Sequence, residues 1–183
     1  MIMKILLTSA GFETKAICDA FLASVGKEPI EIKALFVPTA AIFPAAIAVL
    51  PKCMDDLLNM GIPAENIKVF DLHRSMTIEE LSEFDAVYFT GGSSQYLLNR
   101  INETGFNSPL YEFVNRGGVY VGVSAGSIVA AGNLPCNLGY LKASLRVHLE
   151  TGTAPGVFDH TAVSQIDLTN NAVLIKNDVY EII

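Results

Sequence analysis

Short apolar runs rich in β-branched and aromatic residues alternate along the chain with stretches of helical periodicity. Five such runs predict strands that are each followed by a helical stretch: Ile5–Thr8, Leu35–Val37, Ile67–Phe70, Ala86–Thr90 and Val119–Val123. Alternation of this kind is typical of a parallel sheet with helices on both faces. We therefore predict an α/β fold with three layers, α/β/α, and a mostly parallel sheet.

Local signals mark where several of these helices begin. Thr77 and Glu80 have the spacing of a capping box, and Ser108 before Pro109 predicts an N-cap followed by a first-turn proline. The helix after the first strand is expected to bury a broad apolar face made of Ala16, Ile17, Ala20, Phe21, Leu22 and Ala23.

The strand–helix alternation weakens from about Asn133 onward. Four later segments predict strands: Leu141–Leu149, Ala162–Ile166, Ala172–Lys176 and Val179–Ile183. The last two flank Asn177-Asp178, a tight-turn pair that predicts a closing C-terminal β-hairpin. Because no internal repeat or long linker interrupts the sequence, we expect residues 1–183 to form a single domain whose final quarter is an antiparallel extension.

Composition narrows the class of protein. Hydrophobic residues make up 51% of the 183 positions and charged residues 17%, so the chain can bury a large core and is not disordered. The formal net charge is −7 and no Lys or Arg cluster is present, which argues against nucleic acid as a partner.

Membrane and secretory signals are missing from the sequence. The longest nearly uncharged apolar stretch, Ala40–Pro51, is shorter than the ~18–20 residues of a spanning helix and contains Pro44. Met1–Lys4 leads directly into a predicted strand without the regions of a secretory signal. We therefore expect no membrane partner and a cytoplasmic location.

No cofactor or metal is predicted. The three cysteines form no Cys-x-x-Cys pair and the three histidines are not at ligand spacing, which argues against a disulfide framework and a metal site. Cys18 and Cys53 are expected to pack within helices. A flavodoxin-like nucleotide binder is opposed by the absence of both Gly-x-Gly-x-x-Gly and a P-loop lysine.

Candidate chemistry begins at Gly122-Val-Ser124-Ala-Gly126, which lies between a predicted strand and a predicted helix. This is the pattern of a nucleophile elbow, a cramped turn that exposes a serine hydroxyl at the carboxyl edge of a sheet. A second turn, Thr90-Gly91-Gly92, follows another strand, and ligands bind at this edge in doubly wound sheets. The backbone N–H groups of Gly92 and Ala125 would then form an oxyanion hole.

A serine nucleophile needs a base, and three histidines are available. His148 ends a predicted strand 24 residues after Ser124 and is ranked first. His160 lies in a turn, where solvation is the expected state, and is ranked second. His73 follows the third strand and is interpreted as a surface residue.

Four motifs in succession carry a family resemblance: Tyr88-Phe-Thr-Gly-Gly92, Tyr96-Leu-Leu98, Gly105-Phe106 and Gly117–Ser127. The chain resembles the dipeptidase E family of serine peptidases, which is related to cyanophycinase. The resemblance implies a class I glutamine amidotransferase-like fold with serine replacing cysteine at the elbow. It also implies that Ser124 is the nucleophile, His148 the base, and Gly92 with Ala125 the oxyanion donors, with small peptides as substrates.

Two departures from the family pattern affect what can be carried over. The family's orienting aspartate should follow the serine by some fifteen residues, but Asn133–Gly139 contains no carboxylate. The alternatives Glu150, Asp159, Asn133 and Asn137 stay open. The family cleaves peptides with an N-terminal aspartate, yet no arginine follows His148 to match such a carboxylate, so this preference is not expected here.

These observations favour a serine-type peptidase that forms an acyl-enzyme on Ser124. An esterase or amidase of the same geometry is an alternative, because acyl transfer is common to all three. A catalytically weak or inactive homologue that binds a small molecule or a protein is the alternative from another class. The edge of the terminal hairpin also offers a surface through which a homodimer could pair.

Overall fold

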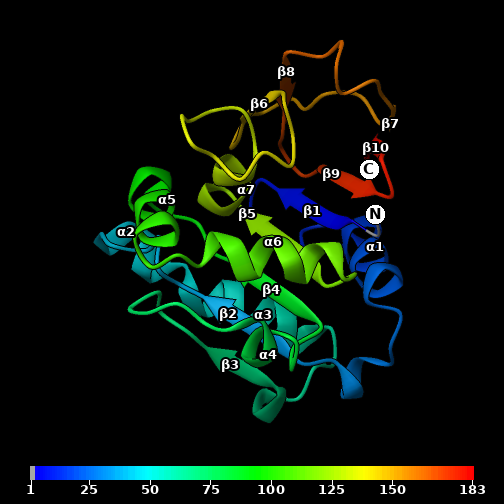
Figure 1. The fold of residues 1–183 in the computed structure, drawn as a ribbon. Coiled ribbons are helices and arrows are strands. Elements are labelled where there is room, and N and C mark those ends of the chain that lie inside the picture. Colours follow the sequence, from blue (N-terminus) through cyan, green and yellow to red (C-terminus); the bar gives the residue numbers. More distant parts are fainter. Residues whose placement is uncertain (1–2) are drawn as a thin grey trace.

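The centre of the structure, a computed structural model that describes residues 3–183, is an eight-stranded sheet (Figure 1). The first five strands in spatial order are parallel and the rest are antiparallel. In spatial order they are β3 (Ile67–Val69), β2 (Ala34–Val37), β4 (Ala86–Phe89), β5 (Val119–Val123), β1 (Lys4–Thr8), β9 (Ala172–Lys176), β10 (Val179–Ile182) and β7 (Gly156–Val157).

Alternate residues of the parallel strands face two separate apolar cores. Ile5 and Leu7 of β1 belong to one core and Leu6 to the other, and all three are buried. Burial on both faces explains why these strands read as continuous apolar runs.

Helices cover both faces of the sheet, as predicted. The first core packs under α4 (Ile78–Leu81), α5 (Ser94–Glu103), α6 (Asn107–Asn115) and α7 (Ala125–Ala130), shown in green to yellow in Figure 1. The second core packs under α1 (Lys15–Val25) and α3 (Leu50–Asn59). Shorter helical segments are α2 (Pro44–Ala48), η1 (Pro29–Glu31) and η2 (Ala64–Asn66). The α/β/α prediction is confirmed.

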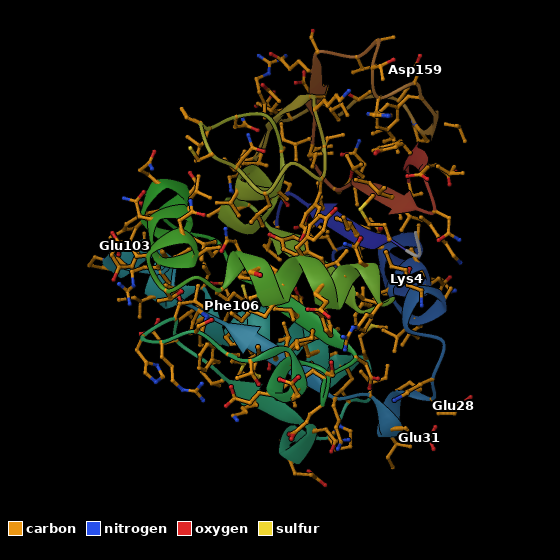
Figure 2. All side chains as sticks on the ribbon, in the orientation of Figure 1. Lys4, Glu28, Glu31, Glu103, Phe106 and Asp159 are labelled. Carbon is orange, nitrogen blue, oxygen red and sulfur yellow. The ribbon has the colours of Figure 1, made fainter. Side chains whose placement is uncertain are left out.

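The core is built of apolar side chains, and charged side chains lie mainly at the periphery. Figure 2 shows Glu28, Glu31 and Glu103 at the periphery, and all three are exposed. Phe106 is fully buried, with its ring centroid 6.5 Å from that of Phe89 in the sheet. Within residues 3–183, none of the helices combines the length and the apolar character that a membrane span requires. The first two residues of Met1–Lys4 lie outside the described residues.

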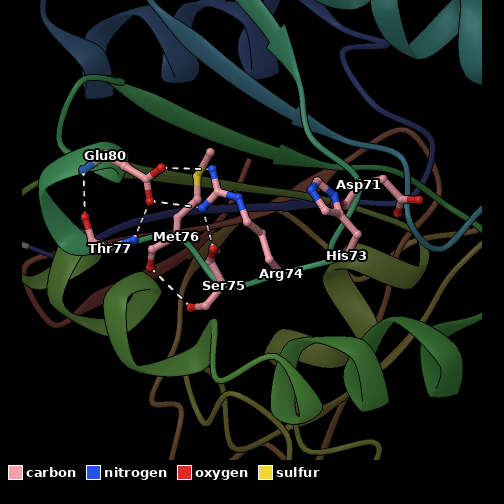
Figure 3. A network of polar contacts seen from close by, with 7 residues as sticks. All are labelled: Asp71, His73, Arg74, Ser75, Met76, Thr77 and Glu80. Atoms are coloured by element: carbon pink, nitrogen blue, oxygen red, sulfur yellow. Dashed lines mark hydrogen bonds and ion pairs between the residues drawn. The ribbon is translucent and has the colours of Figure 1, made fainter.

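The predicted capping box is present at the start of α4 (Figure 3). Thr77 Oγ1 accepts a hydrogen bond from the Glu80 N–H, and the Thr77 N–H donates to Glu80 Oε2 over 2.8 Å. Arg74 also donates to this carboxylate and, with the Thr77 N–H, lowers the pKa of Glu80 to about 2.

Two local predictions were wrong in detail. Helix α6 begins at Asn107, with Phe106 as its N-cap, so Ser108 lies inside the first turn rather than capping it. The tight Gly105 turn, with φ +72°, brings the chain back into a helix two residues later.

The buried face of α1 is a narrow stripe of Ile17, Phe21 and Ser24, whereas Ala16 and Ala23 are exposed. Helical geometry places only every third or fourth residue against the sheet.

The C-terminal part confirms one prediction and corrects another. Strands β9 and β10 form the expected hairpin, with Asn177 and Asp178 both at positive φ in the turn. In contrast, the strands predicted over 141–149 and 162–166 are reduced to β6 (Ser144–Arg146) and β8 (Gln165–Asp167). These two pair in parallel as a separate sheet, so the antiparallel extension does not include them.

Strand β6 pairs with another strand on one side only, and its other side is occupied by a side chain. The Asn133 side chain accepts a hydrogen bond from the Leu145 N–H and donates to the Leu145 carbonyl, each over 2.8 Å. These bonds satisfy the groups that a further strand would use, so β6 stays short and pairs on one side.

Candidate active site

Ser124 lies in the sharp turn between β5 and α7, with φ 48° and ψ −102°. The two neighbouring glycines are required by space. A Cβ at Gly122 would come within 2.6 Å of the Gly126 backbone, and one at Gly126 within 2.6 Å of the Phe89 carbonyl oxygen. The strand–turn–helix context expected for a nucleophile elbow is therefore present.

The end of β1 supports this turn. Thr8 pairs with Val123 in parallel register, and its carbonyl accepts hydrogen bonds from the Ser124 N–H over 3.0 Å and from Ser127 Oγ over 2.7 Å. Because paired strands end at the same edge, the next residues of the two strands, Ser9 and Ser124, emerge beside each other. Ser9 is 2% exposed.

His148 reaches the same place from the loop after β6. Its Nε2 lies 2.9 Å from Ser124 Oγ, so the structure brings together the two residues that the sequence proposed as nucleophile and base. The residue is exposed and has φ 59°, a left-handed conformation that turns the loop toward the sheet edge.

The other two histidines lie elsewhere. His73 is exposed after β3, with Nδ1 2.6 Å from the Asp71 carbonyl oxygen. His160 is not the solvated turn residue that we expected, because its ring stacks on Tyr180 with centroids 4.0 Å apart and is partly buried. Neither hydrogen-bonds to Ser124 in the described part of the chain.

Ser9 is the site residue that the sequence reasoning missed. Its Oγ accepts a hydrogen bond from the His148 backbone N–H over 2.7 Å and lies 3.5 Å from His148 Nδ1. The available signal was its position directly after β1, which matches the position of Ser124 after β5. Using that signal required knowing that β1 and β5 are neighbours.

The four partners proposed for His148 make no hydrogen bond to it among residues 3–183. Asn133 binds the Leu145 main chain and Asn137 binds that of Leu134 and Gly139. The Asp159 carboxylate accepts from Thr161, and Glu150 is exposed to solvent. The position beside Nδ1 is occupied by a neutral hydroxyl instead of a carboxylate.

The backbone N–H groups of Gly92 and Ala125 have no acceptor within residues 3–183. Gly92 has φ 139°, and a Cβ there would meet the Ala40 carbonyl oxygen at 2.0 Å. Only glycine therefore fits this turn.

A pocket of about 540 Å³ opens beside Ser124. Its apolar wall comes from α2 and the start of α3, and includes Phe43, Ala46 and Val49. Cys53 also lines the pocket, and burial raises the pKa of its thiol. No cluster of His, Cys, Asp or Glu suited to a metal ion occurs among residues 3–183.

Comparison with solved structures identifies similar folds. A crystal structure of a candidate peptidase E protein from Listeria monocytogenes EGD-e aligns with a TM-score of 0.75 at 19% identity, covering 100% of this chain and 98% of that one. A peptidase from an acI-B1 Actinobacterium aligns with a TM-score of 0.62 at 17% identity, covering 100% and 88%. At these sequence identities, the structural similarity is evidence for a shared fold alone.

Sequence comparison identifies the family. An uncharacterized peptidase from Pasteurella multocida is 24% identical over 90% of this chain and 74% of its own length. An uncharacterized peptidase from Listeria monocytogenes is 25% identical over 54% of this chain, and the match spans about half (48%) of that relative. The sequence model of peptidase family S51 matches residues 5–143, which confirms the resemblance carried by the motifs. The chain therefore belongs to peptidase family S51.

Proposed function

We propose that the protein is a serine-type peptidase that cleaves small peptides through an acyl-enzyme on Ser124. The observation that carries this proposal is the 2.9 Å distance between Ser124 Oγ and His148 Nε2 at a strained strand–helix turn. A serine held next to a base in this way has the geometry of an activated nucleophile.

The reaction follows from the positions of these groups. His148 Nε2 takes the hydroxyl proton as Ser124 Oγ bonds to the scissile carbonyl carbon, and the N–H groups of Gly92 and Ala125 stabilise the negative oxygen. The C–N bond then breaks as His148 gives the proton to the departing amine. Water attacks the acyl-enzyme with the same histidine as base, which releases the acid and restores Ser124.

Ser9 acts as a positioning residue for His148. If its Oγ accepts from Nδ1–H, the Nε2 lone pair is left free for the Ser124 proton, which is the tautomer that catalysis needs. A neutral hydroxyl stabilises an imidazolium less than a carboxylate does. A wrong tautomer in a serine triad costs ~10⁴ in turnover, so we expect slow turnover between that limit and the rate of a complete triad.

A fluorophosphonate serine-hydrolase probe tests the proposal without a known substrate. We expect the probe to label Ser124, located by mass spectrometry, and the label to be lost in Ser124→Ala and strongly reduced in His148→Ala. Ser108→Ala and His73→Ala are matched controls, because both residues are exposed and outside the pocket. Folded wild-type protein that stays unlabelled would overturn the proposal and favour a binding function.

Peptidase activity needs a second measurement, because a labelled serine is also expected of an esterase or amidase. Incubation with a mixture of dipeptides and tripeptides, followed by mass spectrometry, should show cleavage that is absent in Ser124→Ala. Hydrolysis of esters without any cleavage of peptides would assign the site to an esterase.

A further inference from the structure

The pocket beside Ser124 is almost entirely apolar. Its inner part is formed by Ala46, Cys53 and Val123, which are 6%, 3% and 4% exposed. Phe43 and Val49 form its outer wall and remain 43% and 48% exposed. An apolar group entering the pocket would cover this surface.

Among the described residues, Lys52 is the one formally charged side chain that lines the pocket, and a carboxylate pairs with it. Lys52 Nζ lies 3.3 Å from Asp56 Oδ1 and also donates to the Ala10 carbonyl. Asp56 is itself fixed, because its Oδ2 accepts from Tyr88 Oη over 2.6 Å and from the Phe12 N–H over 3.0 Å. An acidic substrate group would have to compete with a carboxylate that is already in place.

The chemistry decides which half of a substrate uses the pocket. The leaving group must contact His148, take a proton and depart, and His148 is exposed at the mouth. The acyl group stays bonded to Ser124 until water attacks, so it belongs in the enclosed inner part. We propose, on the basis of the function proposed above, that the acyl-side residue of the substrate carries an uncharged aliphatic side chain.

Esters with one leaving group and different acyl chains test this proposal. We compare kcat/KM for p-nitrophenyl acetate, p-nitrophenyl hexanoate and mono-p-nitrophenyl succinate, and subtract the rate of Ser124→Ala for each. Ser124 Oγ bonds to the acyl carbon as p-nitrophenolate leaves, and water then releases the acid. Each buried methylene favours binding about fourfold, so in a partly open pocket hexanoate should exceed acetate by about tenfold or more. Succinate should show no such gain.

Two matched variants distinguish binding of the acyl chain in the pocket from nonspecific binding of apolar chains to the protein surface. Ala45 lines the pocket and is exposed, so Ala45→Phe should fold and should lower the hexanoate-to-acetate ratio about threefold or more by filling space. Ala48 is exposed on the same short helix outside the pocket, so Ala48→Phe should leave that ratio unchanged.

The outcomes distinguish the two proposals. Ser124-dependent hydrolysis that favours acetate or succinate over hexanoate, or a ratio that Ala45→Phe and Ala48→Phe change equally, overturns the aliphatic preference and leaves the serine hydrolase intact. Folded protein that hydrolyses none of the three esters above the Ser124→Ala rate overturns both proposals.

Discussion

A single hydroxyl, that of Ser9, joins the first strand to the loop that carries His148. It faces the imidazole where a serine triad normally has a carboxylate, and it also binds the backbone of the same residue. The backbone bond ties the loop to the end of β1, and the hydroxyl lies 3.5 Å from Nδ1, where we propose that it orients the ring. Both contacts are made to the proposed base.

The first prediction concerns this hydroxyl. Ser9→Ala should lower the rate constant of Ser124 labelling by about tenfold, because a base that loses its orientation spends less time in the reactive geometry. The probe's binding constant should change little. Ser9→Thr, which keeps a hydroxyl, should restore part of the rate. Labelling kinetics at several probe concentrations separate the two constants, and an unchanged rate in Ser9→Ala would remove Ser9 from the site.

The second prediction concerns the glycine turn after β4. Gly92→Ala should lower the free energy of unfolding by about 2 kcal/mol or more, because its Cβ would collide with the Ala40 carbonyl at a positive φ. Gly105→Ala is the matched control, with a positive φ but open space around the added methyl. Urea unfolding measures both, and equal losses would show that the collision is relieved by local movement.

At the scale of elements, β6 leads to His148 and is held by β8 on one side and by the Asn133 side chain on the other. The third prediction is that Asn133→Ala loses about 1–3 kcal/mol of stability with its two hydrogen bonds and slows Ser124 labelling as β6 shifts. Asn102→Ala is the comparison, because Asn102 is exposed and its one bond to Cys136 is 3.5 Å long. Labelling at the wild-type rate in a destabilised Asn133→Ala would show that the loop is held by other contacts.

The elements that the sequence predicts well are those with strong local causes. Strands such as β5 are buried on both faces and read as unbroken apolar runs, and the capping box of Thr77 and Glu80 needs only four residues. In contrast, β6, β7 and β8 have two or three residues each and depend on distant partners such as Asn133. The sequence places His148 near them but cannot give their pairing.

Across the whole molecule, the site draws on distant parts of the chain that include Ser9, Gly92, Ser124 and His148. The elbow and its glycines are visible in sequence because they form one local motif. Ser9 is not, because its role follows from β1 lying beside β5, which only the folded sheet specifies. Local motifs therefore predict the nucleophile, whereas the orienting residue depends on topology.

The fourth prediction follows because the site residues come from distant parts of the chain. Leu145 and Ile166, from the small β6–β8 sheet, belong to the same core as α5 and α6, so the site and the main sheet should unfold together. Loss of Ser124 labelling and loss of far-ultraviolet circular dichroism should share one urea midpoint. Labelling that disappears at lower urea would show that the His148 loop opens before the rest.

The order of the main sheet also has a consequence for behaviour in a crowded solution. Its two outer strands, β3 and β7, have three and two residues, and β3 carries the exposed Lys68 at its centre. Strand β7 already pairs with Glu181 and Ile182 of the terminal hairpin. Such short edges, with a charge at the centre of β3, give a neighbouring chain little backbone to pair with, so we expect the sheet to resist growth into fibrils.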